Sequence, residues 1–193
     1  MPLHIVDGSG KGYRAFVDKE GHLDTHSIID DISYYHTRNK AQCYSANTTN
    51  TADTLTATTT GGAILYLRND SDTYELTISK LMFSAGIAGL VAKVIKNPTL
   101  GTIGKQNTHT PVNLNFNSNN PANVTCYNWD ETGDGMTGLT VGTTMATFIL
   151  PASPLIIPVD GAILLKRNDS IQINCKGAGE FTAFIRFFMR EIV

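Results

Sequence analysis

Charged side chains are scarce in this sequence of 193 residues. Asp, Glu, Lys and Arg together make up 17% of the chain, below the roughly 25% of an average soluble domain. The formal net charge is −2, whereas a protein that binds DNA or RNA usually presents a clearly basic surface. We therefore expect no nucleic acid among the partners.

Cysteine is scarce too, and no apolar segment is long. Cys43, Cys126 and Cys175 lie far apart and are odd in number, which favours a reducing folding compartment over a disulfide framework or a cysteine metal site. The longest apolar stretch, 81–92, is too short to span a bilayer. The N-terminus lacks the basic segment and apolar core of a signal peptide. We expect neither membrane association nor export by a cleaved signal.

Sequence signatures of catalysis and of metal binding are absent or incomplete. Neither a GxSxG nucleophile motif nor an HExxH zinc motif occurs. The segment 130–135, DETGDG, begins like a calcium-binding loop, but Val141 stands where the twelfth position requires a bidentate glutamate. The sequence therefore predicts no enzymatic activity, no cofactor and no metal site, and favours a structural or binding role.

Threonine and asparagine are abundant instead, and they favour strands and turns respectively. From Gly61 onward, short apolar runs are separated by turn residues at intervals of about 8 to 15 residues, which is typical of a sandwich. The runs predict an all-β β-sandwich over 61–193, with a hairpin joining its first two strands. The predicted strands are 63–69, 74–83, 90–96, 112–117, 122–129, 145–150, 162–168, 170–175 and 181–193.

The first 60 residues differ from the rest in composition, and we interpret 1–60 as an N-terminal arm and linker. Residues 13–25 predict a short hairpin. Residues 27–36 carry apolar side chains at helical spacing and predict one short helix, with a strand as the alternative. The Thr-rich segment 46–60 has few apolar side chains, so it predicts a linker or an exposed edge strand.

One ten-residue segment occurs twice. GAILYLRNDS at 62–71 and GAILLKRNDS at 161–170 agree at eight of ten positions. The functional interpretation is a repeated ligand loop. The alternative, which we favour, is an old duplication or the same strand-and-turn requirement in two sheets.

The C-terminal segment has apolar side chains on both faces of its predicted strand. One face carries Phe184, Arg186, Phe188 and Arg190. A strand on the outside of a monomer should alternate apolar and polar residues. We therefore expect the second face to contact another subunit, with a second sheet or the arm as alternatives. The other face consists of Phe181, Ala183, Ile185, Phe187 and Met189.

Trp129 is the single tryptophan, and it precedes an acidic turn that includes Asp130 and Asp134. A tryptophan at a strand end next to a polar loop can stack on a sugar or on a partner surface. These three residues form a possible ligand loop. The alternative for Trp129 is a place in the core or in a lid over it.

Four segments, taken in order, resemble virion proteins of tailed bacteriophages. They are RAFVDKEGHLDTHS, HTRNKAQCYSAN, the Thr-rich stretch and GGAILYLRNDSD, and the likeness covers roughly residues 13–80. In that group an N-terminal portion precedes a jelly-roll domain that usually trimerises. The resemblance therefore implies a jelly-roll-like β-sandwich with an extended N-terminal arm.

The function that the resemblance implies is decoration or cementing of a bacteriophage capsid by a homotrimer. The partner would be the major capsid protein, and the location would be the capsid surface, after assembly in the host cytoplasm. The second hypothesis is a receptor- or carbohydrate-binding knob of a tail or head appendage. Aromatic, aliphatic and arginine side chains are favoured at interfaces, so the expected arm contacts are Tyr13, Arg14, Phe16, Ile28, Ile29, Tyr34 and Tyr35.

Overall fold

The computed structural model describes most of the chain, and each element in the described part is a β-strand. This content confirms the predicted all-β class. The chain forms two compact units, residues 1–31 and residues 32–193. The described residues are 5–6, 14–17, 23–24, 42–48, 53–55, 61–116, 118–130, 134–140 and 142–192.

The N-terminal unit contains a three-stranded antiparallel sheet in the order β1-β2-β3. β2 pairs with β3, which confirms the hairpin predicted over 13–25. The helix or strand predicted over 27–36 lies outside the described residues. The three strands are β1 (Ile5–Val6), β2 (Arg14–Val17) and β3 (Leu23–Asp24).

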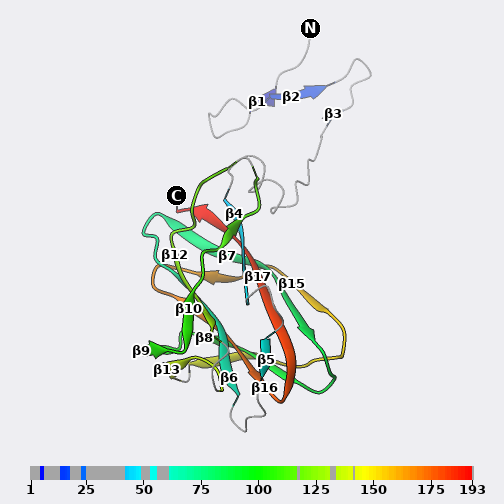
Figure 1. The fold of residues 1–193 in the computed structure, drawn as a ribbon. Helices are drawn as coiled ribbons and strands as arrows, with labels where there is room; N and C mark the ends of the chain where they lie inside the picture. Colours follow the sequence, from blue (N-terminus) through cyan, green and yellow to red (C-terminus); the bar gives the residue numbers. More distant parts are fainter. Residues whose placement is uncertain are drawn as a thin grey trace. The chain divides into compact units, whose positions relative to one another are not determined.

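The larger unit contains two six-stranded sheets (Figure 1). The β6 sheet has the order β10-β12-β6-β16-β8-β14. Its strands are β6 (Gly62–Asn69), β8 (Val91–Lys96), β10 (Gln106–Thr108), β12 (Val124–Trp129), β14 (Thr143–Ile149) and β16 (Ser170–Lys176).

The second, the β17 sheet, has the order β11-β4-β17-β7-β15, and β5 pairs with the start of β17. A separate two-stranded sheet pairs β9 (Thr99–Gly104) with β13 (Thr137–Thr140). The strands of the β17 sheet are β4 (Cys43–Asn47), β5 (Asp53–Leu55), β7 (Tyr74–Ala85), β11 (Val112–Asn113), β15 (Leu155–Leu165) and β17 (Gly179–Glu191).

The strand pairs of the two sheets are nested along the sequence. β4 pairs with β17, β6 with β16, β7 with β15 and β8 with β14, and each pair is antiparallel. Early strands thus meet late strands in reverse order. β9 to β13 form an insertion between β8 and β14.

The predicted hairpin between the first two sandwich strands is wrong. β6 lies between β12 and β16, whereas β7 lies between β17 and β15, so the chain crosses from one sheet to the other after Asn69. All but one residue of β6 is buried. Such a strand has no exposed face whose pattern reveals its neighbours, so sequence proximity was the only guide to its partner.

Side chains from both sheets form one hydrophobic core, so the sheets pack as the predicted β-sandwich. The predicted inner face of β17 is buried from Phe181 to Met189. Two ring contacts link it to neighbouring strands: the Tyr44 and Phe187 ring centroids are 5.5 Å apart, and those of Phe83 and Phe181 are 6.0 Å apart.

Several boundaries differ from the predicted ones. β4 and β5 precede residue 61 but pair with β17, so the sandwich includes strands from the segment that we assigned to arm and linker. The edge-strand interpretation of 46–60 holds at β5. The strand predicted over 112–117 is limited to β11, and the strand predicted over 162–168 begins earlier, at Leu155.

Candidate functional site

The two copies of the repeated segment end at corners where the chain crosses between the sheets. The first corner leads from β6 to β7, and the second leads in the opposite direction, from β15 to β16. The corners contact each other: Asn69 N donates to Asp169 O at 3.1 Å, and Asn168 N donates to Asn69 O at 2.8 Å. This arrangement favours the interpretation that the repeat meets the same strand-and-turn requirement in two sheets.

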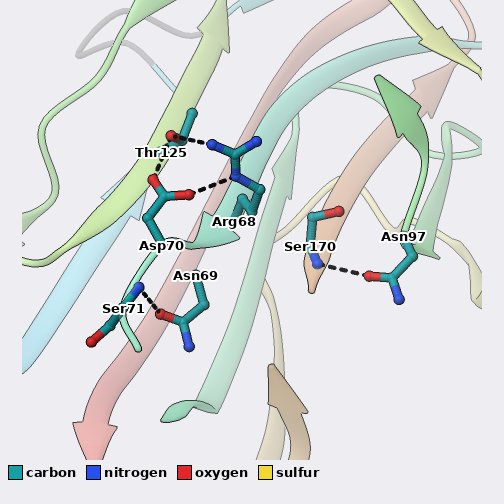
Figure 2. A network of polar contacts seen from close by, with 7 residues as sticks. All are labelled: Arg68, Asn69, Asp70, Ser71, Asn97, Thr125 and Ser170. Carbon is teal, nitrogen blue, oxygen red and sulfur yellow. Dashed lines mark hydrogen bonds and ion pairs between the residues drawn. The ribbon is translucent and has the colours of Figure 1, made fainter. Parts of the chain in front are cut away.

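At the first corner, Arg68, Asp70 and Thr125 form a closed polar triangle (Figure 2). Arg68 Nε lies 2.6 Å from Asp70 Oδ1, and the Thr125 hydroxyl donates to Asp70 Oδ2 at 2.5 Å. Arg68 also donates to Thr125 Oγ1 at 3.2 Å. The hydrogen bond to Asp70 raises the pKa of Arg68. The triangle links β6 to β12, on which Thr125 pairs with Arg68.

Asn69, in the same corner, is 0% exposed. Its Nδ2 donates to Tyr74 O at 2.8 Å and to Leu165 O at 3.0 Å, while its Oδ1 accepts from Ser71 N at 3.0 Å. A buried amide is tolerated when its donors and acceptors are satisfied in this way. Asn69 therefore joins the end of β6 to the start of β7 and to the end of β15.

The second corner uses the same residue types differently. Asn168 is exposed and has a φ of 66°, a left-handed conformation that asparagine adopts more readily than most residues. The Asp169 carboxylate accepts from Asn97 Nδ2 at 2.9 Å, and Asn97 Oδ1 accepts from Ser170 N at 2.7 Å. Polar atoms of both corners thus bond to the chain itself, which favours a connecting role over a ligand-binding one.

Of the two interpretations given for Trp129, the structure favours the core. Trp129 is 1% exposed and belongs to the hydrophobic core, so its ring does not stack on a surface ligand. The core alternative is confirmed. Asp130 N donates to Lys105 O at 3.2 Å, Asp134 is exposed, and 131–133 lie outside the described residues.

The second face of β17 is partly buried within the chain. Phe188 is 4% exposed, Phe184 and Arg186 are half-buried, and Arg190 is exposed. The Ser79 hydroxyl donates to Arg186 O at 3.2 Å, where a register shift bends β17 against β7. The subunit contact predicted for this face stays a prediction, and the burial of Phe188 limits it to the other three residues.

A small pocket of mixed character lies beside Phe184. Its volume is about 250 Å³. Hydroxyl and amide groups line it together with Phe184 and Met82. It lies on the β17 sheet, and the lining residues from β4, β7 and β17 include Asn47, Ser84 and Thr182.

A different and strongly apolar surface lies where the sandwich is open. β14 ends the strand order of the β6 sheet, and β15 ends that of the β17 sheet. A pocket of about 280 Å³ opens between residues of these two strands. Its lining includes Met145, Ala146, Phe148, Ile157, Val159 and Ile163. We call the surface of β14 and β15 around this pocket the open edge.

Large apolar side chains are exposed on the same two strands, and Met145 among them lines the pocket. Ile149 is 76% exposed, Ile156 is 53% exposed and Met145 is 44% exposed. The sequence between Asp134 and Asp160 contains no Asp, Glu, Lys or Arg. Sequence reasoning missed this surface, and its one signal was that long segment without charge.

The residues predicted as arm contacts fall mostly outside the described ranges. Arg14 and Phe16 lie in β2 of the N-terminal unit. Their contact with a partner stays a prediction. The other predicted contacts, for which the structure gives no position, are Tyr13, Ile28, Ile29, Tyr34 and Tyr35.

The three cysteines are buried free thiols. Burial raises the pKa of Cys126 and of Cys175 to about 12, so both remain protonated and unreactive at neutral pH. Within the described ranges, no group of three or more His, Cys, Asp or Glu side chains is placed to hold a metal ion. The same ranges contain no helix long and apolar enough to cross a membrane.

Comparison of the chain with protein-family models, with curated proteins and with solved structures finds no match.

Proposed function

We propose that this protein is a structural virion protein of a tailed bacteriophage that binds the capsid surface as a homotrimer and decorates or cements it. The observation that carries the proposal is the nested strand pairing of the sandwich. Eight strands in two sheets, paired first with last in reverse order, support assignment to the jelly-roll class, which includes viral capsid domains and lectins.

The surface chemistry supports adhesion between proteins. Apolar surface that is exposed on two adjacent edge strands is typical of a site that another protein covers. Such an adhesion protein gains affinity from several copies acting together, because each bound copy holds its neighbours close to their own sites. A trimer with one capsid contact per copy would bind in this way.

The receptor- or carbohydrate-binding alternative has lost one of its supports. It placed the ligand at the loops around Trp129 and Asp130, and the Trp129 ring is buried. We therefore propose a protein partner, the major capsid protein, rather than a sugar.

Co-sedimentation of the full-length protein with purified heads and tails of the encoding phage tests this proposal. The protein should pellet with heads and saturate them at a fixed ratio. Binding to tails alone, or to neither, would contradict the proposal.

A chain without the N-terminal unit tests the contribution of that unit to binding. The truncation removes no core residue of the sandwich, because those residues start at Tyr44. A chain without residues 1–31 should keep the circular dichroism spectrum of a β protein. It should also lose most of its binding to heads. If the truncated protein saturates heads as the full chain does, the predicted arm contacts within residues 1–31 are wrong.

A further inference from the structure

The open edge presents both free backbone groups and apolar side chains. We propose that copies of this protein bind one another through this surface, formed by β14 and β15. The inference rests on the proposed function in one respect, because it identifies the subunit contact of the homotrimer. The arguments for the surface itself come from its edge, its shape and its charge.

The edge of β14 is protected only by a register shift near Thr144. β14 pairs with β8 on one side, and no described strand pairs with it on the other. Natural proteins usually block such an edge with charged residues, proline or bulges, because free N–H and C=O groups invite pairing with another chain. β14 contains neither charge nor proline, and its one register shift lies near Thr144. A monomer that exposed this edge permanently would be prone to aggregate.

The same surface has exposed apolar side chains and a pocket. Ile149 and Ile156 are exposed on its two strands, and the pocket, which their neighbours Phe148 and Ile157 line, has a volume of about 280 Å³. A cavity of about 150 Å³ already holds a benzene ring, so an isoleucine side chain fits. One copy can therefore insert an isoleucine into the pocket of the next. If each copy inserts into the next copy and the same neighbour does not insert back, the contact is head-to-tail and can close into a ring of three.

The charge and size of the open edge favour a second copy over other occupants. Its strands carry no charge before Asp160, so a charged ligand finds no complementary group on β14. β14 contributes 7 residues and β15 contributes 11, with the loop 150–154 between them. A stable protein interface takes about 20 to 30 residues from each partner. The open edge reaches the lower end of that range.

Sedimentation of the full-length protein with Ile149→Asp and Ile156→Asp tests the inference. Both side chains are more than half exposed, so aspartate at these positions leaves the core intact. The unchanged protein should sediment at three times the chain mass of 20.9 kDa. Each variant should weaken self-association roughly tenfold or more, because a charge enters an apolar contact. The double variant should sediment as a 20.9 kDa monomer.

Val112→Asp is the matched control. Val112 is 53% exposed, as Ile156 is, and it lies in β11 at the other end of the β17 sheet. This variant should assemble like the unchanged protein. Circular dichroism and thermal melting of all five proteins show whether each one is folded.

The outcomes separate this inference from the proposed function. If the unchanged protein is monomeric, or if the double variant assembles as well as Val112→Asp, the open edge is not the contact between copies. Assembly that the double variant abolishes, together with failure to bind heads, contradicts the capsid role and leaves the inference standing. A dimer that the variants dissociate supports the surface and contradicts the trimer.

Discussion

The two corners, 68–71 and 167–170, have the same four residues, RNDS, but opposite environments. In the first, Asn69 is fully buried and bonds three backbone groups. In the second, Asn168 is exposed, with a left-handed backbone. The arginines differ as well, since Arg68 is paired with Asp70 while Arg167 is exposed. A repeated sequence therefore specifies a corner without specifying how deep that corner lies.

The contact between the corners explains this difference. Asn69 is buried because it ends β6, a strand that is buried almost throughout its length. The second corner follows β15, an edge strand with several exposed residues. Position in the sheet order, central for β6 and terminal for β15, thus decides which copy becomes structural and which stays at the surface.

The largest effect is expected for Asn69→Ala. This change removes three hydrogen bonds and leaves Tyr74 O, Leu165 O and Ser71 N without their partner. Each buried polar group that loses its partner costs about 1 to 3 kcal/mol, and relaxation recovers part of the sum. We expect a loss of about 2 to 4 kcal/mol in the free energy of unfolding. Urea titration, followed by the fluorescence of the buried Trp129, measures it.

Asn168→Ala provides the comparison at the matching position of the second copy. Its cost should be smaller, because Asn168 is exposed. If the two variants cost the same, burial is not what distinguishes the corners.

The strands of the sandwich were largely predictable from the sequence. Alternating apolar residues identified β7, β16 and β17 because period 2 is a local property. The partners of β6 were not predictable, since burial of both faces erases the alternation. β9 and β10 were missed as well. Their sequences, TLGTIG and QNT, are too polar and too short to show a pattern.

The sites were less predictable than the strands. Phe188 and Trp129 appeared available in the sequence, and both are buried in the structure. The only local signal of the open edge was the uncharged segment between Asp134 and Asp160. The exposure of the open edge depends on β14 and β15 being last in their sheets, which is a property of the whole strand order.

A smaller effect is expected from the backbone at Asn168. An alanine with a φ of 66° carries left-handed strain of about 1 kcal/mol, whereas glycine carries none. Asn168→Ala should therefore lower the free energy of unfolding by about 1 kcal/mol. Asn168→Gly should change it by less than about 0.5 kcal/mol in the same urea titration, because glycine adopts this backbone conformation without strain. Equal losses for the two variants would mean that the amide, and not the backbone, matters at this corner.

The smallest effect is expected at the arginines, where Arg68→Gln and Arg167→Gln form a matched pair. Arg68→Gln breaks a partly exposed ion pair with Asp70, which is worth about 0.5 to 1 kcal/mol because solvent screens it. Arg167 is exposed, so its replacement should change stability by less than about 0.3 kcal/mol. Raising NaCl to about 1 M should narrow the gap between the two variants, since salt weakens the ion pair alone. If the gap is unchanged by salt, Arg68 stabilises the corner through packing and hydrogen bonds rather than through charge.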